Sequence, residues 1–317
     1  MSLPKVVVTR ALPDGWLDAL AHRCEAVIGP ADRGGWCDET WAALPEAEGI
    51  FAMLTEPVDR EVLARAPKLR VVSNMAVGVD NIDLAACRSR GIAVGNTPGV
   101  LTEATADLTM ALVLAWSRRV VEAAADARDG RWRTWSPTGW LGRDLAGARL
   151  GLVGFGKIAR AVCRRALGFG MKVAYTRRSS GVDHAGATRM ELPELLASSD
   201  IVSVHVPLGE ATRGLIDRDA LARMRPGALL VNTARGPIVD RDALLDALVR
   251  GHLGGAALDV TDPEPLPASD PLYALPSVLV LPHIGSATVG TRRAMAQLAC
   301  ENLLAGLAGQ PLPHAVA

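Results

Sequence analysis

Three side chains of this 317-residue chain have types suited to joint chemistry, although they come from distant stretches: Arg235, Glu264 and His283. Each follows a short apolar run that is typical of a strand. Arg235 can clamp a carboxylate through paired, charge-assisted hydrogen bonds. His283 can exchange a proton near neutral pH, and Glu264 can hold the imidazole and stabilise its charged form. Because ligands of open α/β sheets bind beyond the carboxyl ends of the strands, the three could converge on one crevice.

Each of these residues also has a purely structural interpretation. Arg235 could cap a helix, Glu264 could shape a turn between two prolines, and a lone histidine after a proline is often structural. His205 could face a cofactor, although packing at a strand end explains it better. We expect structural roles for the five remaining histidines, which are His22, His184, His205, His252 and His314.

A glycine-rich turn with the spacing GxGxxA lies between a predicted strand at 149–154 and a predicted helix at 157–167. Gly154 permits a tight turn, and Gly156 lets the backbone approach a pyrophosphate at the helix N-terminus. Ala159 still allows close packing. The alternative is a glycine turn of the kind found in any α/β protein. The predicted cofactor-binding residues of this turn are Gly154, Phe155, Gly156, Lys157 and Ile158.

The next predicted strand, 172–176, ends where a dinucleotide-binding domain contacts the adenosine ribose. An acidic residue there favours NAD, and a basic one accommodates the 2′-phosphate of NADP. The chain has Thr176, Arg177 and Arg178, followed by Ser179 and Ser180, with no carboxylate. An arginine fork together with a hydroxyl could grip a phosphate. We therefore expect NADP(H) to be preferred and NAD(H) to be possible, unless the arginines are only solvated surface charges.

Short apolar runs alternate with amphipathic or alanine-rich stretches in two blocks, a pattern typical of parallel strands joined by crossover helices. We expect two doubly wound α/β domains. The predicted strands are 6–9, 50–54, 70–74, 149–154, 172–176, 201–205, 228–232, 255–259 and 278–281. The predicted helices are 15–23, 60–66, 84–90, 102–118, 157–167 and 290–308. The helix at 102–118 is apolar almost all round, which predicts burial on every side, and the stretch after 308 is expected to be frayed.

Composition excludes several classes of protein. The chain has 34 basic and 34 acidic side chains, which leaves no basic field for nucleic acid. Its longest apolar run, 110–116, is far shorter than the ~20 residues that cross a bilayer. Five scattered cysteines form no CxxC pair, so we expect buried fillers and no metal site. These features, with no signal-peptide core at the start, favour a cytoplasmic protein that binds neither nucleic acid nor membranes.

Taken in order, several motifs resemble the D-isomer-specific 2-hydroxyacid dehydrogenases, and most of all the glyoxylate and hydroxypyruvate reductases. The resemblance covers nearly the whole chain. Besides the glycine-rich turn, it rests on Met75-Ala-Val-Gly-Val-Asp-Asn-Ile-Asp83, Gly95-Asn-Thr-Pro-Gly-Val-Leu-Thr-Glu-Ala-Thr-Ala-Asp107, Asn232-Thr-Ala-Arg-Gly236, the Asp259 to Leu266 segment and Pro282-His-Ile-Gly-Ser-Ala-Thr288.

The resemblance implies specific roles. Arg235 would bind the substrate carboxylate and carbonyl region, His283 would donate the proton in reduction, and Glu264 would pair with His283. The backbone at Val77 and Gly78 would complete the carboxylate site. Leu54 would border the substrate, and Asp259 would meet the nicotinamide amide. The further residues implied on the cofactor side are Thr105, Pro207, Thr212, Thr233, Ala234, Arg235, His283 and Gly285.

The resemblance also implies two Rossmann-like or flavodoxin-like domains with an active-site cleft between them. The substrate-binding domain would be residues 1–98 plus 286–317, and the dinucleotide-binding domain residues 99–285. The long helix after residue 102 and the loop that follows it would form the interface of a homodimer. Related reductases carry an aromatic residue just after the proline of that loop. Here Gly139 lies near that place, with Trp140 next, which puts substrate preference in doubt.

The expected function is NADPH-dependent reduction of a small 2-oxo acid, glyoxylate or hydroxypyruvate, to glycolate or D-glycerate. One alternative is an NAD-linked D-2-hydroxyacid dehydrogenase of another substrate, such as D-lactate. The other is a nucleotide-sensing binding protein of the corepressor kind, for which the short tail gives little support. Glu264 stands where formate-oxidising relatives carry glutamine, which disfavours formate oxidation.

Overall fold

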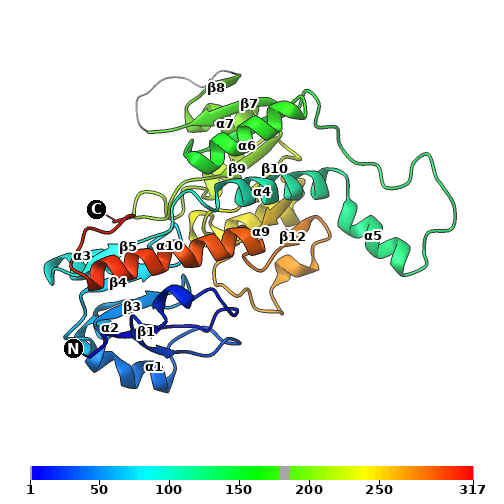
Figure 1. Cartoon of the computed structure of the whole chain (residues 1–317). Coiled ribbons are helices and arrows are strands. Elements are labelled where there is room, and N and C mark those ends of the chain that lie inside the picture. Colours follow the sequence, from blue (N-terminus) through cyan, green and yellow to red (C-terminus); the bar gives the residue numbers. More distant parts are fainter. Residues whose placement is uncertain (1, 179–185, 317) are drawn as a thin grey trace. The chain divides into compact units, whose positions relative to one another are not determined.

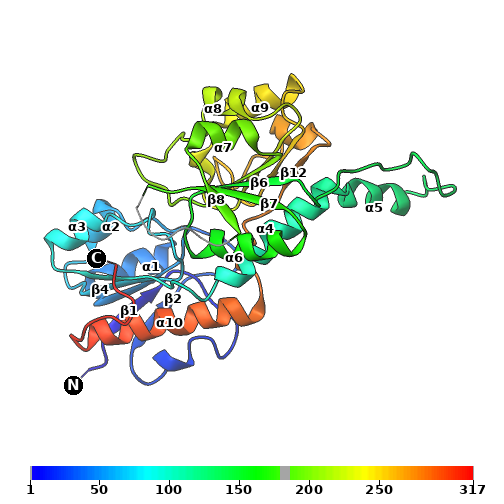
Figure 2. The same ribbon diagram turned by 90° about the horizontal axis from the view of Figure 1, so that it is seen from above.

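The computed structural model describes residues 2–178 and 186–316, and these form two compact units. Unit 1 comprises residues 1–101 and 287–317, and unit 2 comprises residues 102–286. Each unit is built around its own parallel sheet with helices on both faces (Figures 1 and 2). Among the described residues, no helix combines the length and apolar character needed to span a bilayer. All five cysteines are free and buried, which confirms their prediction as core fillers.

Unit 1 contains a five-stranded sheet in the order β2-β1-β3-β4-β5. Its strands are β1 (Lys5–Val8), β2 (Glu25–Ile28), β3 (Gly49–Ala52), β4 (Val71–Asn74) and β5 (Ala93–Gly95). Its helices are α1 (Asp38–Ala43), α2 (Arg60–Arg65), α3 (Leu84–Ser89) and α10 (Val289–Leu307). Short 3-10 helices lie at Asp18–Leu20 (η1) and Leu44–Glu46 (η2).

Alternate residues of these strands face opposite layers, because side chains along a strand alternate between its two faces. Val6, Val8, Phe51 and Val71 belong to the cluster built on α10. Val7, Ile50, Ala52 and Val72 belong to the cluster with residues of α2 and α3. Burial on both faces explains why these strands are continuous apolar runs rather than alternating ones.

Unit 2 contains a seven-stranded parallel sheet in the order β12-β11-β10-β9-β6-β7-β8. Its strands are β6 (Arg149–Val153), β7 (Lys172–Thr176), β8 (Ala187–Arg189), β9 (Ile201–Val204), β10 (Leu229–Asn232), β11 (Gly255–Leu258) and β12 (Val278–Val280). Its helices are α4 (Thr102–Ser117), α5 (Val120–Arg128), α6 (Lys157–Gly168), α7 (Leu192–Ser198), α8 (Arg218–Arg223) and α9 (Arg241–Val249). The 3-10 helices are η3 (Gly236–Ile238) and η4 (Pro271–Ala274).

Two core clusters cover the faces of this sheet. Residues of α4 and α6 pack on one face, and residues of α7, α8 and α9 pack on the other, as Figure 2 shows. The α/β fold with two parallel sheets is therefore the one expected. In Figure 1, α5 and the chain after it extend away from the sheet of unit 2.

The prediction of a helix at 15–23 is wrong. Only the single turn η1 forms there, because Gly15 and His22 adopt positive φ angles of 81° and 59° that bracket it. Trp16, Leu17 and Leu20 instead pack in the cluster around α10. Tertiary burial thus replaces helix extension.

The prediction that the helix at 102–118 is buried on every side is also wrong. Glu103, Asp107 and Ala111 are exposed on α4. These residues are spaced by four, so they form one face of the helix. Arg165 of α6 pairs with both acidic residues, 2.8 Å from Glu103 and 2.7 Å from Asp107.

The stretch after residue 308 is not frayed, contrary to expectation. It pairs antiparallel with the edge strand β5, with Ala315 opposite Gly95. Val316 donates its N–H to the Val94 carbonyl at 2.7 Å, and Asn96 donates to the His314 carbonyl at 3.1 Å. The tail therefore covers an edge that would otherwise expose unpaired backbone groups.

Candidate active site

The three chemically promising residues follow three neighbouring strands of unit 2. Arg235 comes after β10, Glu264 after β11 and His283 after β12, and the three strands pair in parallel. Their carboxyl ends therefore lie at the same edge of the sheet. The register of the strands thus brings the three following loops to one edge, as the sequence pattern indicated.

The turn that carries Arg235 is built by Asn232, the last residue of β10, which is 1% exposed. Its Nδ2 donates to the Arg235 carbonyl at 2.8 Å, and its Oδ1 accepts from the Ala234 N–H at 3.0 Å. The Arg235 guanidinium donates to the Ala234 carbonyl at 2.8 Å. Arg235 remains half-buried, so it can reach a ligand at the edge of the sheet.

Gly236 holds this turn against the segment that leads to Glu264. A Cβ atom added at Gly236 would lie 1.9 Å from the Thr261 carbonyl oxygen. Only glycine therefore lets the backbone after Arg235 touch the backbone of the next loop. Sequence reasoning did not single out Gly236, although its position directly after Arg235 in the Asn232–Gly236 motif was a usable signal.

His283 and Glu264 form the closest polar contact of the site. Their Nδ1 and Oε1 atoms are 2.6 Å apart, and the two side chains are 22% and 33% exposed. The other Glu264 oxygen, Oε2, accepts from the Thr261 N–H at 3.5 Å. A carboxylate at this distance holds the imidazole in one orientation. The second ring nitrogen, Nε2, is then the one that can serve a ligand.

Asp259 fixes the backbone around His283. The Asp259 carbonyl accepts from the His283 N–H at 3.0 Å. Its carboxylate oxygens accept from the N–H groups of Ile284 at 2.7 Å and Gly285 at 2.8 Å. His283 has a φ of +53°, in the left-handed region that non-glycine residues rarely occupy. The three hydrogen bonds of Asp259 therefore maintain an unusual conformation at the proposed proton donor.

The electrostatics of Asp259 reflect two opposing effects. Its side chain is almost fully buried, and burial raises the pKa of Asp259 because it disfavours the charged form. The N–H groups of Ile284 and Gly285 and the nearby His283 oppose that rise. Each carboxylate oxygen keeps a second lone pair, so Asp259 retains the capacity to accept from a ligand amide.

Residues of α4 complete this end of the site. A Cβ on Gly285 would lie 3.0 Å from Asp259 Oδ2 and 3.6 Å from Thr105 Oγ1. Thr105, Asp259 and Gly285 are therefore neighbours. Thr109, one helical turn further on, lies 3.1 Å from Thr233 through the two hydroxyl oxygens. Thr109 was missed, and its spacing of four residues from Thr105 was the available signal.

The glycine-rich turn has the geometry that a dinucleotide needs. Gly154 has a φ of +94°, and a Cβ there would lie 2.7 Å from the His205 carbonyl oxygen. Nothing lies within 4 Å of a Cβ at Gly156, the residue that precedes α6. The space beside Gly156 and the N–H groups that begin α6 thus form a cradle for a pyrophosphate. Phe155 contributes only backbone, because its ring stacks on Tyr175 with a centroid separation of 3.8 Å.

Both arginines after β7 are anchored by the fold. The Arg177 guanidinium lies 5.7 Å from the centre of the Tyr175 ring. Arg178 donates to the Ala211 carbonyl at 3.0 Å, next to Thr212, whose hydroxyl donates to the Pro207 carbonyl at 2.6 Å. The predicted adenosine-side residues therefore lie together. Ser179 and Ser180 lie outside the described residues.

His205 belongs to the packing of β9 rather than to proton exchange. Its Nε2 lies 2.9 Å from the Ser203 hydroxyl oxygen. Burial lowers the pKa of His205 to about 4, so the ring is neutral at physiological pH. This agrees with the structural role favoured from the sequence.

The remaining predicted residues, Leu54, Val77 and Gly78, belong to unit 1 and follow β3 and β4. Carbonyls of the second loop are tied back to the body of unit 1: Val77 O accepts from Asn96 Nδ2 at 2.8 Å, and Gly78 O from Asn74 Nδ2 at 2.9 Å. Within the described residues, the N–H groups of Val77 and Gly78 have no hydrogen-bond acceptor. Two such adjacent donors suit an anion.

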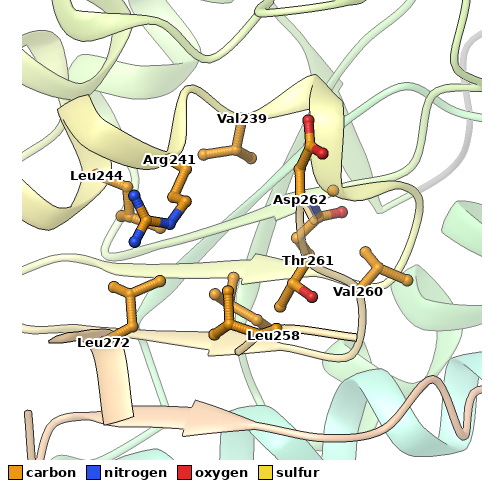
Figure 3. Close-up of a pocket in the computed structure, with 11 residues that line it drawn as sticks. Val239, Arg241, Leu244, Leu258, Val260, Thr261, Asp262 and Leu272 are labelled. Atoms are coloured by element: carbon orange, nitrogen blue, oxygen red, sulfur yellow. The ribbon is translucent and has the colours of Figure 1, made fainter. Parts of the chain in front are cut away.

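A small pocket lies beside the site, and none of the side chains of Arg235, Glu264 and His283 line it (Figure 3). Apolar residues such as Val239, Leu244 and Leu258 line it, together with the Thr261–Asp262 backbone region. Thr261 and Asp262 belong to the segment that leads to Glu264, so the pocket borders that segment.

Comparisons with known proteins match the chain to one family. The model of the D-isomer specific 2-hydroxyacid dehydrogenase NAD-binding domain matches residues 110–285. A glyoxylate reductase of Korarchaeum cryptofilum is 44% identical over 324 residues, covering 99% of this chain and 96% of that protein.

Two solved structures extend the similarity to three dimensions. A Thermus thermophilus protein has a TM-score of 0.92 and 50% identity, covering 99% of this chain and 100% of that one. An NADPH-dependent glyoxylate/hydroxypyruvate reductase of Sinorhizobium meliloti, solved with NADP and malonate, has a TM-score of 0.88 and 32% identity. That alignment covers 100% of this chain and 97% of that one.

The fold and the site thus define an oxidoreductase that uses a nicotinamide cofactor on a small-molecule substrate. More narrowly, the chain belongs to the D-isomer specific 2-hydroxyacid dehydrogenase family.

The contact at Gly236 gives a first test. Replacing Gly236 with Ala should lower the free energy of unfolding by about 1–3 kcal/mol, since the added methyl overlaps backbone that cannot move aside like a side chain. Gly168→Ala is the matched control, because a Cβ there meets nothing within 4 Å. Denaturant unfolding of both variants measures the difference. Equal stability of the two variants would show that the Arg235 turn does not press on the Glu264 segment.

Proposed function

We propose that this chain reduces a small 2-oxo acid, glyoxylate or hydroxypyruvate, to the 2-hydroxy acid with NADPH as the reductant. The observation that carries the proposal is the 2.6 Å pair of Glu264 and His283 at the sheet edge that also carries Arg235. The names of the Korarchaeum and Sinorhizobium relatives support the substrate class. Glycolate and D-glycerate would be the products.

In this proposal Arg235, His283 and Glu264 of unit 2 each have one task. Arg235 binds the substrate carboxylate and orients the neighbouring carbonyl, which turns an encounter into a reactive geometry. The bound cofactor supplies the hydride for the carbonyl carbon. His283 gives its Nε2 proton to the carbonyl oxygen, so that no free alkoxide accumulates. Glu264 holds His283 through Nδ1 and so orients the donor.

The N–H groups of Val77 and Gly78 in unit 1 are proposed to bind the substrate carboxylate as well. They are adjacent donors without an acceptor among the described residues, and hydrogen bonds to a charged acceptor are the stronger kind. Leu54 is proposed to border the substrate. Its partly buried position after β3 would favour small acids.

The proposed cofactor contacts follow from the geometry of unit 2. Gly154, Gly156, Lys157 and Ile158 would hold the pyrophosphate at the start of α6. Asp259 would accept from the nicotinamide amide beside Thr105, Thr233, Ala234 and Gly285. Thr176, Arg177, Arg178, Pro207 and Thr212 would surround the adenosine end. A basic rather than acidic end of β7 supports NADPH over NADH.

We also propose that the enzyme is a cytoplasmic homodimer. Five free, buried cysteines suit a reducing compartment. The chain from α5 to residue 142 exposes large apolar side chains, including Trp132 at 71% and Trp135 at 78%. Large apolar side chains exposed together along one segment are typical of an interface, and a second copy is the proposed partner.

A spectrophotometric assay tests the function and the cofactor preference together. Loss of reduced-cofactor absorbance is followed with NADPH or NADH and glyoxylate, hydroxypyruvate or pyruvate. We expect turnover with NADPH. The double change Arg177→Ala and Arg178→Ala should raise KM for NADPH by at least about tenfold, because two charge-assisted hydrogen bonds to the 2′-phosphate are lost. KM for NADH should barely change.

Lys172→Ala is the control, since Lys172 lies at the opposite end of β7. Equal use of both cofactors, unaffected by the double change, would remove the phosphate-binding argument. Turnover of pyruvate with NADH alone would favour a D-lactate-type dehydrogenase. No turnover with any 2-oxo acid would point to a nucleotide-sensing binding protein.

The role of Glu264 predicts a loss of activity that falls mainly on kcat. Glu264→Gln keeps the size of the side chain but removes the charged acceptor that holds His283 through Nδ1. The kcat of reduction should therefore fall roughly tenfold, while the Kd for NADPH stays within about threefold. Steady-state kinetics and a cofactor titration measure the two effects. Full activity of the variant would contradict the assigned role of Glu264.

A further inference from the structure

Two asparagine side chains join the two loops of unit 1 that were assigned to the substrate. The first loop, residues 53–58, follows β3 and contains Leu54. The second loop, residues 75–82, follows β4 and contains Val77 and Gly78. The resemblance assigned substrate contacts to both loops, but it gave no role to Asn74 or Asn81.

The hydrogen bonds form a directed chain from one loop to the other. Asn74 Nδ2 donates to the Gly78 carbonyl at 2.9 Å and to Asn81 Oδ1 at 3.0 Å. Asn81 Nδ2 donates to the carbonyls of Met53 and Glu56, both at 3.0 Å. An amide nitrogen has two N–H donors. The donors of Asn74 therefore hold the second loop, and those of Asn81 tie that loop to the first one.

The main chain of Asn81 adds to the same connection. Its carbonyl accepts from the Val58 N–H at 2.8 Å, and the Asp83 N–H donates back to the Val58 carbonyl at 3.0 Å. The first loop is anchored on its far side as well. Glu56 is fully buried and accepts from the Thr9 hydroxyl at 2.9 Å and the Gly35 N–H at 3.0 Å. Asn81 thus connects the second loop to a fixed support.

The orientation of the second loop follows from these contacts. Its carbonyls at Ala76, Val77 and Gly78 accept from Thr97, Asn96 and Asn74, at 2.9, 2.8 and 2.9 Å. With three successive carbonyls committed to the body of unit 1, the N–H groups of Val77 and Gly78 stay available. Asn81 orients the Asn74 amide, which in turn holds the Gly78 carbonyl.

We infer that Asn81 is a positioning residue for substrate binding: it sets the Val77–Gly78 N–H donors, and Leu54 on the other loop, at a fixed distance from each other. This inference rests on the proposed function for the identity of the ligand. Asn81 touches neither the substrate nor the cofactor. It acts through Asn74 and through the Met53 and Glu56 carbonyls, so its loss should weaken substrate binding while the cofactor still binds.

The amide of Asn81 is essential to this role. The change Asn81→Asp keeps an acceptor for Asn74 but brings a negatively charged oxygen against the Met53 and Glu56 carbonyls. Asn81→Asp and Asn81→Ala should therefore act in the same direction, and both should free the two loops.

Ser73→Ala is the matched control for these variants. Ser73 lies in β4 beside Asn74, is fully buried and donates to the Ala299 carbonyl of α10 at 2.7 Å. The change Ser73→Ala removes a buried hydrogen bond on the other face of the sheet of unit 1 and alters no hydrogen bond of the two loops. A general loss of stability would affect Ser73→Ala and Asn81→Ala equally.

The experiment combines steady-state kinetics with hydrogen exchange on the full chain. In Asn81→Ala and Asn81→Asp, KM for glyoxylate should rise about tenfold with kcat within about threefold, and the Kd for NADPH should not change. Amide exchange measured by mass spectrometry should rise in both 53–58 and 75–82. Ser73→Ala should show neither effect.

Either of two results would overturn the inference: an unchanged KM in an active Asn81 variant, or exchange in both loops that matches Ser73→Ala. A wild-type chain that reduces no 2-oxo acid would instead contradict the proposed function. In that case the exchange data would still decide whether Asn81 holds the two loops together.

Discussion

The contact between the Glu264 carboxylate and the His283 imidazole is the interaction on which the proposed chemistry depends. A single carboxylate at 2.6 Å orients the ring and leaves its second nitrogen, Nε2, for a ligand. The contact forms because β11 and β12 are neighbours in a parallel sheet, which brings their following loops to one edge. Asp259 then fixes the loop of His283, and Gly236 lets the loops after β10 and β11 touch.

The same principle operates in unit 1 with neutral groups. Asn74 and Asn81 use side-chain amides to hold two loops at the carboxyl ends of β3 and β4. Amides suit this place because each can donate and accept at once, so a chain of hydrogen bonds can be satisfied without a buried charge. In both units, short polar side chains at strand ends position backbone groups, and the sheets supply the rigid support.

Much of the fold followed from the sequence because parallel strands buried on both faces are continuous apolar runs. The glycine-rich turn was predictable because its conformation requires glycine: Gly154 has a positive φ, and Gly156 leaves open space beside the backbone. The prediction of a helix at 15–23 was wrong because Trp16, Leu17 and Leu20 are stabilised more by packing in the cluster around α10 than by extending a helix. The prediction that the tail after residue 308 is frayed was wrong because its pairing with β5 is a long-range contact that local composition does not encode.

The site residues likewise divide into those that local sequence indicates and those whose role depends on long-range contacts. Arg235, Glu264 and His283 could be predicted because their side chains can bind a carboxylate or exchange a proton, and because each follows a predicted strand. Gly236 and Thr109 had only their places beside Arg235 and Thr105 as signals, and Asn81 had none, because the importance of all three lies in what they touch across the fold. Nothing in the sequence shows that a Cβ at Gly236 would lie 1.9 Å from the Thr261 carbonyl oxygen.

The proposed chemistry requires Arg235 and His283 to act on one small carboxylate beside the nicotinamide. A crystal structure of the chain with NADP and the unreactive anion oxalate tests this requirement most directly. We expect one carboxylate of oxalate on the Arg235 guanidinium, with an oxalate oxygen within hydrogen-bond distance of His283 Nε2. Oxalate bound away from Arg235, or His283 turned from the anion with Glu264 unpaired, would contradict it.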